Sequence, residues 1–333
     1  MKTGLEEAFR GKKVLVTGGL GFIGSNLSIR LVELGARVTI VDNMMPRLGG
    51  NLFNVGEITD RIHINFSDVR DGHSMDYLVK EQEYIFHLAG QVNHVDSIRN
   101  PIQDLDINCR GTLVLLECCR KYNPDTKIVF AGTRGEYGSS VKLPVGEDHP
   151  TNPKGIYAVT NLSAEKMVLV YDDVHRISGT CLRITNTYGP RHQMAHDEYG
   201  VLNWFIRKAI GDEPLPVFGD GRILRDFLYV DDLVDCFLEV ATCPAAYGGV
   251  FNVGTGIPIS FIELAKKIVE IAGSGKVTFT EFTKERKEVE PGDYYTDISK
   301  IKRIVGWKPK VSLDEGIGKT VEFYHKYKKE YWG

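Results

Sequence analysis

The feature that most constrains the fold is a glycine-spaced turn near the start of the chain. A β-branched run at 12–17 ends in Thr17-Gly-Gly-Leu-Gly-Phe-Ile-Gly24, and apolar residues then recur at helical spacing to residue 34. A second apolar run follows at 37–42. A strand, a tight turn, a helix and a second strand in this order predict a right-handed crossover between two parallel strands.

The alternation of short apolar runs with helical patterns continues through the first half of the chain. It predicts an α/β fold, a Rossmann-type doubly wound parallel sheet with helices on both faces. The expected strands are 62–66, 84–89, 127–131 and 180–183, and the expected helices lie near 75–80 and over 105–121 and 156–175.

The rhythm changes beyond Asn186, where glycine, proline and charged residues become more frequent. We therefore predict a sheet domain over residues 1–185, to which later elements near 226–256 return. Residues 186–333 are expected to form mainly a smaller C-terminal lobe that is interleaved with the sheet domain.

Composition narrows the class of protein. The 333 residues carry a net charge of −3, which gives no general attraction to nucleic acid or to an anionic membrane. The chain opens without an apolar signal core and has no apolar run of membrane-spanning length, so we expect a cytoplasmic protein. The six cysteines lack paired metal spacing, and His192-x-x-x-His196 is a weak pattern, so no metal is predicted.

The glycine turn also predicts a dinucleotide site. Gly18 permits the tight turn, Gly21 lets the backbone approach a pyrophosphate, and Gly24 allows close packing of helix on strand. The start of the helix supplies free N–H groups for the phosphates. Asp42 ends the second strand, where its carboxylate can bind ribose hydroxyls and repel a 2′-phosphate, which favours NAD over NADP.

Further motifs resemble the extended short-chain dehydrogenase/reductase family, in its nucleotide-sugar epimerase/dehydratase branch. The matching segments are residues 17–24, His87-Leu-Ala-Gly-Gln91, Asn108-x-x-Gly-Thr112, Arg183-x-x-Asn-x-Tyr-Gly-Pro-Arg191, Arg225-Asp-Phe-x-Tyr-Val-Asp231 and Phe251-Asn-Val-Gly254. The resemblance covers nearly the entire chain. It implies NAD contacts from Gly18, Gly21, Phe22, Ile23, Gly24, Asp42, Asn43, Asp68, Val69, Leu88, Ala89, Gly90 and Asn108.

The resemblance also implies catalytic residues. Tyr157 matches the base that takes the proton of a sugar hydroxyl while its hydride passes to the nicotinamide, and Thr133 matches the residue that hydrogen-bonds the same oxygen. The family lysine four residues after the tyrosine is replaced here by Asn161, which supplies no charge. We hypothesise that Lys154, Arg134 or the nicotinium ring carries the missing positive charge.

The residues after Thr133 bear on the reaction. Dehydratases of this branch place an Asp-Glu pair next, whereas this chain has Arg134 and Gly135. The pattern favours 4-epimerisation, in which C4 is oxidised, the keto sugar rotates and the hydride returns. A 4,6-dehydratase, for which Glu136 would have to substitute, a 4-dehydrogenase and a catalytically impaired binding protein are the alternatives.

The expected substrate is a nucleotide-diphosphate sugar, most simply a UDP-sugar. The resemblance implies that Asn186 contacts the diphosphate, that Arg225 balances a phosphate charge and that Asp293 contacts a ribose. Arg286 is an alternative arginine nearby. In the family, helices such as those expected at 105–121 and 156–175 pair between subunits, so the resemblance implies a homodimer. The substrate-binding residues predicted in this way are Gln91, Asn93, Arg134, Glu136, Asn186, Arg191, Arg225 and Asp293.

Overall fold

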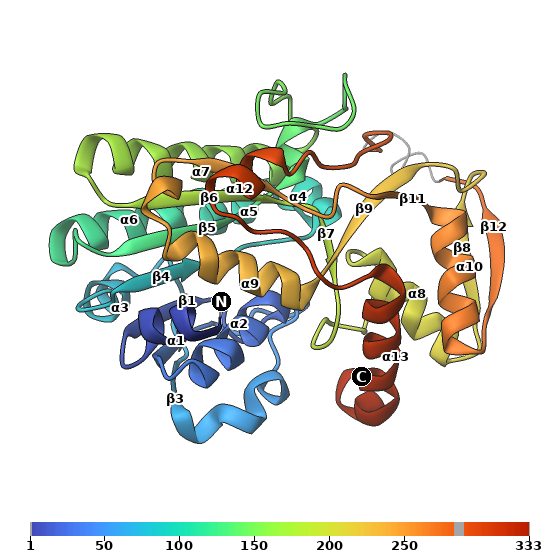
Figure 1. Ribbon diagram of the computed structural model, residues 1–333, viewed down its shortest axis with the longest axis horizontal. Coiled ribbons are helices and arrows are strands. Elements are labelled where there is room, and N and C mark those ends of the chain that lie inside the picture. The colour runs from blue at the N-terminus through green and yellow to red at the C-terminus, as the bar shows by residue number, and fades with distance from the viewer. Residues whose placement is uncertain (1, 283–289, 333) are drawn as a thin grey trace.

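A parallel sheet forms the centre of the larger part of the molecule (Figure 1). The computed structural model describes residues 2–282 and 290–332. Over these residues the sheet has seven strands in the order β10-β6-β5-β4-β1-β2-β3, all of them parallel. The predicted fold class is confirmed. The strands are β1 (Lys13–Thr17), β2 (Arg37–Val41), β3 (Ile62–Asn65), β4 (Tyr84–His87), β5 (Lys127–Thr133), β6 (Gly179–Ile184) and β10 (Val250–Val253).

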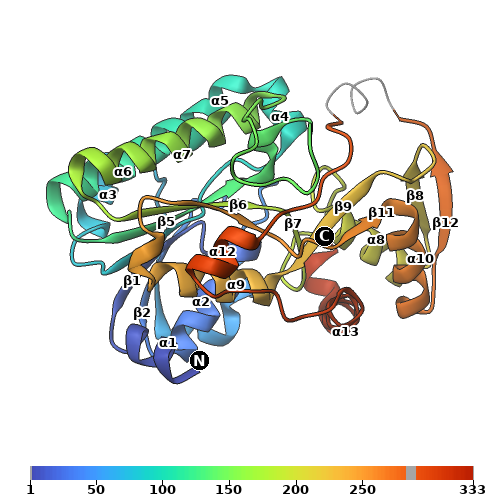
Figure 2. The ribbon, with the colours of Figure 1, turned by 45° about the horizontal axis from the view of Figure 1, so that its top comes forward.

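Helices cover both faces of this sheet because successive residues of a buried strand point to opposite sides. Val14 and Val16 of β1 pack with α2 (Phe22–Glu33) and α9 (Val230–Ala241), whereas Leu15 packs in a second core. Figure 2 shows the helices of that second face, α6 and α7, lying together across the sheet from α2 and α9. The helices on the second face are α3 (Gly72–Leu78), α6 (Gly111–Tyr122) and α7 (Ile156–His175).

The smaller lobe has its own core between helices and short strands. Leu202 and Ile206 of one helix, Leu264 of a second and Ile317 of a third pack together there. The helices are α8 (Val201–Ile210), α10 (Phe261–Ala272) and α13 (Leu313–Tyr331). The strands are β7 (Asn186–Tyr188), β8 (Pro214–Phe218), β9 (Leu224–Tyr229), β11 (Pro258–Ser260) and β12 (Lys276–Thr280), with β9 between β11 and β7 and with β8 beside β12.

The chain returns from the lobe to the sheet domain. Residues 226–229 belong to β9, between the lobe and the sheet domain. After them, α9 packs on α2 and β10 pairs with β6. A second return, which the sequence did not suggest, brings α12 (Ser299–Ile304) and Trp307 into the core of the sheet domain. The Trp307 indole N–H donates to the Asp232 carbonyl at 3.0 Å, which fastens this return to α9.

The expected helix at 105–121 is divided in the structure. α5 (Pro101–Leu105) leads into a π-helical turn, η2 (Asp106–Arg110), before α6 begins. Such turns widen a helix locally and are common near functional sites. The remaining elements are α1 (Lys2–Phe9), α4 (His94–Arg99) and the 3-10 segments η1 (Leu52–Arg61), η3 (Arg134–Tyr137) and η4 (Pro244–Ala246).

Candidate active site

A cavity of about 610 Å³ lies between the carboxyl ends of the parallel strands and the smaller lobe. Loops after β1, β2, β3, β4 and β5 line one side, and α8, β8 and β9 line the other. Open parallel sheets bind ligands at this edge because every strand ends there in a loop. The cavity is large enough for two ligands of moderate size to lie side by side.

The glycine turn shapes one wall of the cavity. Gly18 has φ of +70°, and a Cβ there would lie 2.8 Å from the Ala89 nitrogen. A Cβ at Gly24 would overlap the Gly18 carbonyl oxygen, so both positions require glycine. Gly21 caps α2 without a side-chain hydrogen bond, which leaves the first N–H groups of the helix free for an anion.

Two carboxylates stand beside that turn. Asp42 accepts hydrogen bonds from the Leu20 and Met44 backbone N–H groups at 3.0 and 2.8 Å, while burial raises the pKa of its carboxyl. Asp68 is held by Arg70, whose Nε and Nη2 donate at 2.8 and 2.7 Å and which holds the pKa of Asp68 at about 2. Both carboxylates line the cavity, and Asp42 is the one that binds the glycine turn, through the Leu20 N–H.

A buried histidine positions the loop after β4. Thr112 donates to the Asn108 carbonyl at 2.6 Å, so its oxygen is left to accept from His87 Nε2–H at 3.0 Å. His87 Nδ1 then accepts from the Thr17 hydroxyl at 2.8 Å. Thr17 Oγ1 in turn accepts from the backbone N–H of Ala89 at 3.1 Å. This chain fixes the wall formed by Leu88, Ala89 and Gly90.

Tyr157 and Thr133 meet in the cavity, one from α7 and the other from the end of β5. Burial raises the pKa of Tyr157 to about 12, while a hydrogen bond with the Thr133 side chain and the charge of Arg134 act in the opposite direction. The His94 ring packs edge-on against Tyr157, 4.5 Å between centroids. Two hydroxyls and a cation therefore lie together at one end of the cavity.

Asn161 does not line the cavity. Its side-chain amide donates to the Tyr157 carbonyl at 2.8 Å, one turn back along α7, and the side chain is buried. Lys154, in the loop before α7, does line the cavity. Of the proposed sources of positive charge on the protein, Arg134 and Lys154 are both present at the site.

Glu136 lies behind the cavity wall and not in it. Its carboxyl is fully buried, accepts from the Thr133 backbone N–H at 3.1 Å and contacts Arg183 Nε at 3.1 Å. Arg183 also binds Glu165 through two hydrogen bonds of 2.8 Å. Burial and the Glu165 charge raise the pKa of Glu136 well above its ordinary value. The expectation of a sugar contact from Glu136 is at odds with this position, because the carboxyl is bound to Arg183 of β6 and points away from the cavity.

On the lobe side of the cavity, two polar side chains come from paired strands. Asn186 of β7 and Arg225 of β9 both line it. Arg225 donates to the Leu224 and Gly292 carbonyls at 2.9 and 2.6 Å and forms an ion pair with Glu290. Asp293 accepts from the Leu224 backbone N–H at 2.9 Å and lies outside the lining. Arg286 lies outside the described residues.

Four other predicted residues support the walls without lining the cavity. Gln91 and Asn108 bind each other through the Gln91 backbone, and Asn93 caps α4. Arg191 binds the Asn54 carbonyl, Asn26 and Glu57, and so joins the lobe to the sheet domain. Each of these side chains is held by protein partners, which favours a supporting role over the predicted ligand contact. The predicted residues that do line the cavity are Gly18, Gly21, Phe22, Ile23, Gly24, Asp42, Asn43, Asp68, Val69, Leu88, Ala89, Gly90, Thr133, Arg134, Tyr157, Asn186 and Arg225.

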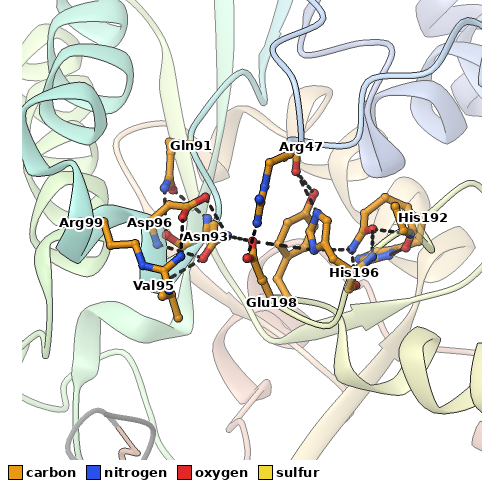
Figure 3. Close-up of polar contacts among 12 residues, drawn as sticks. Arg47, Gln91, Asn93, Val95, Asp96, Arg99, His192, His196 and Glu198 are labelled. Carbon is orange, nitrogen blue, oxygen red and sulfur yellow. Dashed lines mark hydrogen bonds and ion pairs between the residues drawn. The ribbon is translucent and has the colours of Figure 1, made fainter. Parts of the chain in front are cut away.

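Three loops meet across the mouth of the cavity (Figure 3). Glu198 lies between Arg47, with which it forms an ion pair, and Asn93, which donates to its carboxylate. The Tyr199 hydroxyl and His196 Nε2 both contact the Arg47 carbonyl, at 3.0 and 3.2 Å. The loops after β2, β4 and β7 are thereby tied together over the site, and we call the Arg47–Glu198–Asn93 contact the latch.

Within residues 2–282 and 290–332, no group of three or more His, Cys, Asp or Glu side chains has the geometry of a metal site. No helix in that part of the chain is long and apolar enough to cross a bilayer. His192 Nδ1 lies 2.7 Å from the Gln193 carbonyl, and its ring packs against Phe22.

Sequence reasoning missed several residues of the site. The ring of Tyr294 stacks on Arg134, and the sequence did not pair Glu198, in the polar loop expected over the pocket, with Arg47, 151 residues away in the chain. Aromatic rings of the lobe line the end near Arg225, and their spacing in the sequence carries no periodic signal. Tyr294 could have been found, since it directly follows Asp293. The aromatic residues are Phe205, Phe218, Phe227, Phe261 and Phe282.

The fold and site together define a dinucleotide-binding protein with a Thr–Tyr hydroxyl pair at the reacting end of its cavity. The family model for GDP-mannose 4,6-dehydratase matches residues 15–320. The chain therefore belongs to this family, which groups nucleotide-sugar epimerases and dehydratases within the extended short-chain dehydrogenase/reductases.

Individual relatives are similar over almost the whole chain. A putative UDP-glucose 4-epimerase of Methanocaldococcus jannaschii is 36% identical, covering 93% of this chain and 97% of that protein. The crystal structure of the Thermotoga maritima UDP-glucose 4-epimerase with UDP-glucose superposes with a TM-score of 0.87 at 34% identity, covering 95% and 99%. The Thermus thermophilus UDP-glucose 4-epimerase in complex with NAD has a TM-score of 0.84 at 30% identity, covering 94% and 99%.

Proposed function

We propose that this protein is an NAD-dependent nucleotide-sugar 4-epimerase, with a UDP-sugar as substrate. The observation that carries the proposal is the pairing of Tyr157 and Thr133 in a cavity whose other wall is the glycine turn. A base on the hydroxyl oxygen and a cofactor face at the carbon are what the oxidation of a secondary alcohol requires.

The protein groups around the cavity fit NAD. The free N–H groups at the start of α2 suit a pyrophosphate, and Gly21, directly before them, has no side chain to stand in its way. Asp42 is placed to accept hydrogen bonds from ribose hydroxyls and to repel a 2′-phosphate. Arg47, the cation nearest in sequence that could bind such a phosphate, is committed to the latch. Bound NAD would accept the hydride from C4 of the sugar and return it.

The residues of the chain handle the proton of the reaction. Tyr157 Oη takes the proton of the C4 hydroxyl, and the Thr133 hydroxyl stabilises the oxygen that bears the negative charge. When the keto sugar has rotated, the same tyrosine returns the proton. Because the Tyr157 pKa lies at about 12 in the protein alone, the reaction needs nearby positive charge, and Arg134 supplies part of it.

Epimerisation is favoured over 4,6-dehydration by the residues directly after Thr133. Elimination needs an acid and a base beside the sugar, and this segment offers Arg134 and Gly135 to the cavity. The carboxyl of Glu136, the remaining candidate, is fully buried against Arg183. We therefore place dehydration second, with a 4-dehydrogenase and a non-catalytic binding protein as further alternatives.

The product of a single incubation separates these functions. Purified protein with NAD and UDP-glucose or UDP-glucuronate should give a C4 epimer by ¹H NMR, with no net NADH formed. A stable 4-ketone with stoichiometric NADH would identify a dehydrogenase, and a 6-methyl signal a dehydratase. Tight binding of NAD and UDP-sugar without any turnover would identify a binding protein and overturn the proposal.

We also propose a homodimer formed through α6 and α7. Leu113 of α6 and Val159, Val170 and Val174 of α7 are exposed apolar side chains on neighbouring helices. Sedimentation should give a dimer, and Val170→Asp with Val174→Asp should give monomers. Val141→Asp, at an exposed apolar position in a loop outside α6 and α7, is the matched control. A cytoplasmic location would suit the six free cysteines.

A further inference from the structure

Within the part of the chain that the structure describes, two arginines line the cavity, and they differ in how their charges are balanced. The Arg225 guanidinium donates to two backbone carbonyls and forms an ion pair with Glu290. Arg134 stacks on the ring of Tyr294, 5.0 Å from its centroid. Among residues 2–282 and 290–332, it forms no ion pair and no hydrogen bond through its guanidinium.

The charge of Arg134 lies at the reacting end of the cavity. Arg134 directly follows Thr133, and its charge acts on both Tyr157 and His94. Burial, with a smaller effect from Arg134, lowers the pKa of His94 to about 4, so this imidazole is neutral at pH 7 and does not compete for an anion. Burial and repulsion from Arg225 lower the pKa of Arg134 itself to about 10, against smaller opposing effects of Tyr294 and of Glu290, whose carboxylate is paired with Arg225. A partly buried cation without a carboxylate is costly unless a ligand supplies the counter-charge.

We propose that Arg134 binds a carboxylate on the sugar, so that the substrates are nucleotide-linked hexuronic acids. This inference rests on the proposed function, because it takes Tyr157 and Thr133 to hold the C4 hydroxyl. In a hexuronic acid the carboxylate carbon is C6, which is attached to C5, the neighbour of the reacting carbon C4. A planar guanidinium stacked on a ring presents two parallel N–H groups, which match the two oxygens of a carboxylate. Arg225, which comes from β9 on the lobe side of the cavity, is left for the diphosphate.

The test is ligand binding, which needs no turnover. Titration calorimetry on NAD-loaded protein would compare UDP-glucuronate with UDP-glucose, which differ at C6 alone. Loss of a charge-assisted hydrogen bond weakens binding by roughly 10- to 100-fold, so wild-type protein should prefer the uronate by about that factor. Arg134→Gln should bring the ratio of the two dissociation constants close to one, and Arg134→Lys should give an intermediate ratio.

The matched control is Arg222→Gln, which removes the same charge from a side chain that is 85% exposed and outside the cavity lining. It should leave the ratio unchanged. Equal weakening of both ligands by Arg134→Gln would overturn the inference, because the diphosphate or Tyr157 would then be the partner. Absence of a preference in the wild-type protein would overturn it without any variant.

The outcome is separable from that of the proposed epimerisation. An Arg134-dependent preference for the uronate, together with release of CO₂ and a pentose product by NMR, would retain carboxylate recognition and reject the epimerase. Epimerisation of UDP-glucose with no preference for the uronate would retain the epimerase and reject carboxylate recognition by Arg134.

Discussion

Asn161 donates its side-chain amide to the backbone carbonyl of Tyr157, 2.8 Å away and one turn earlier on the same helix. The bond directs the amide along α7 and away from the cavity. Asparagine at this position is therefore a structural member of the helix, and the tyrosine depends on other residues for its acidity.

Replacing Asn161 with lysine should restore a cation beside Tyr157. A neighbouring positive charge lowers the pKa of an acid by roughly 1–3 units, so the pH at which the rate reaches half its maximum should fall by a comparable amount. The measurement is a pH–rate profile of kcat for the epimerisation. Asn161→Ala removes the amide without adding charge and should leave the midpoint where it is. An unchanged profile for Asn161→Lys, in a protein that still melts cooperatively, would mean that charge does not limit the reaction.

Removing the Thr133 hydroxyl should slow the chemical step. Thr133→Val deletes the hydrogen bond that favours the ionised form of Tyr157, so kcat should fall by roughly 10- to 100-fold and the pH profile should move to higher pH. Thr133→Ser keeps the hydroxyl and should retain most of the rate. Because this oxygen also accepts the Gly135 N–H, the affinity for NAD should be measured in parallel, and a large loss of affinity would point to a structural role.

Breaking the latch should speed the loss of NAD. Glu198→Gln removes the negative charge that binds both Arg47 and Asn93. Loss of an interaction of about 1 kcal/mol corresponds to a severalfold faster dissociation of NAD. Stopped-flow displacement of NAD from the purified protein would measure the rate. Glu57→Gln, which breaks the ion pair with Arg191 away from the cavity lining, is the control. Equal rates for wild-type protein and Glu198→Gln would show that the loops open independently of this contact.

The buried His87 predicts acid sensitivity of the fold. Burial lowers its pKa to about 4, below the value of about 6.5 for an unfolded chain, so the unfolded state binds more protons between these two pH values. Stability is therefore complete above pH 6.5 and is lost as the pH falls toward 4. At pH 5 this one histidine should cost about 2 kcal/mol of the free energy of unfolding.

Chemical denaturation of wild-type protein and of His87→Gln at pH 7 and pH 5 would measure that loss. The variant is expected to be less stable at pH 7 because it cannot make both threonine bonds as the ring does. Its decline between the two pH values should nevertheless be smaller by about 2 kcal/mol. Identical declines would show that His87 takes up a proton in the folded protein.

The parts of the site that the sequence predicted are those set by local geometry. The glycine turn, Asp42 at the end of a strand, and Thr133 and Tyr157 all follow from an element boundary or from a motif within a few residues, and the structure brings them to one cavity. The long helix α7 was predicted at its observed bounds, because its apolar stripe is continuous.

The parts that could not be predicted depend on partners distant in the chain. Glu136 is drawn inward by Arg183 on the adjacent strand, and Arg191 is held by Glu57 and its neighbours. In each case the sequence shows which side chain is present but not the direction in which it points. A change of one rotamer decides whether that side chain contacts a ligand or another part of the protein. The π-helical turn that interrupts the expected helix at 105–121 likewise has no signal in apolar periodicity.

The double return of the chain, first through α9 and β10 and later through α12 and Trp307, has a consequence for protein engineering. The smaller lobe is built from three separate stretches of sequence. It therefore cannot be exchanged between relatives by replacing one continuous segment of the chain. A chimaera that changes sugar preference would have to transplant all three stretches together or alter individual positions in place. Point substitution is thus the practical route for redesigning what this scaffold accepts.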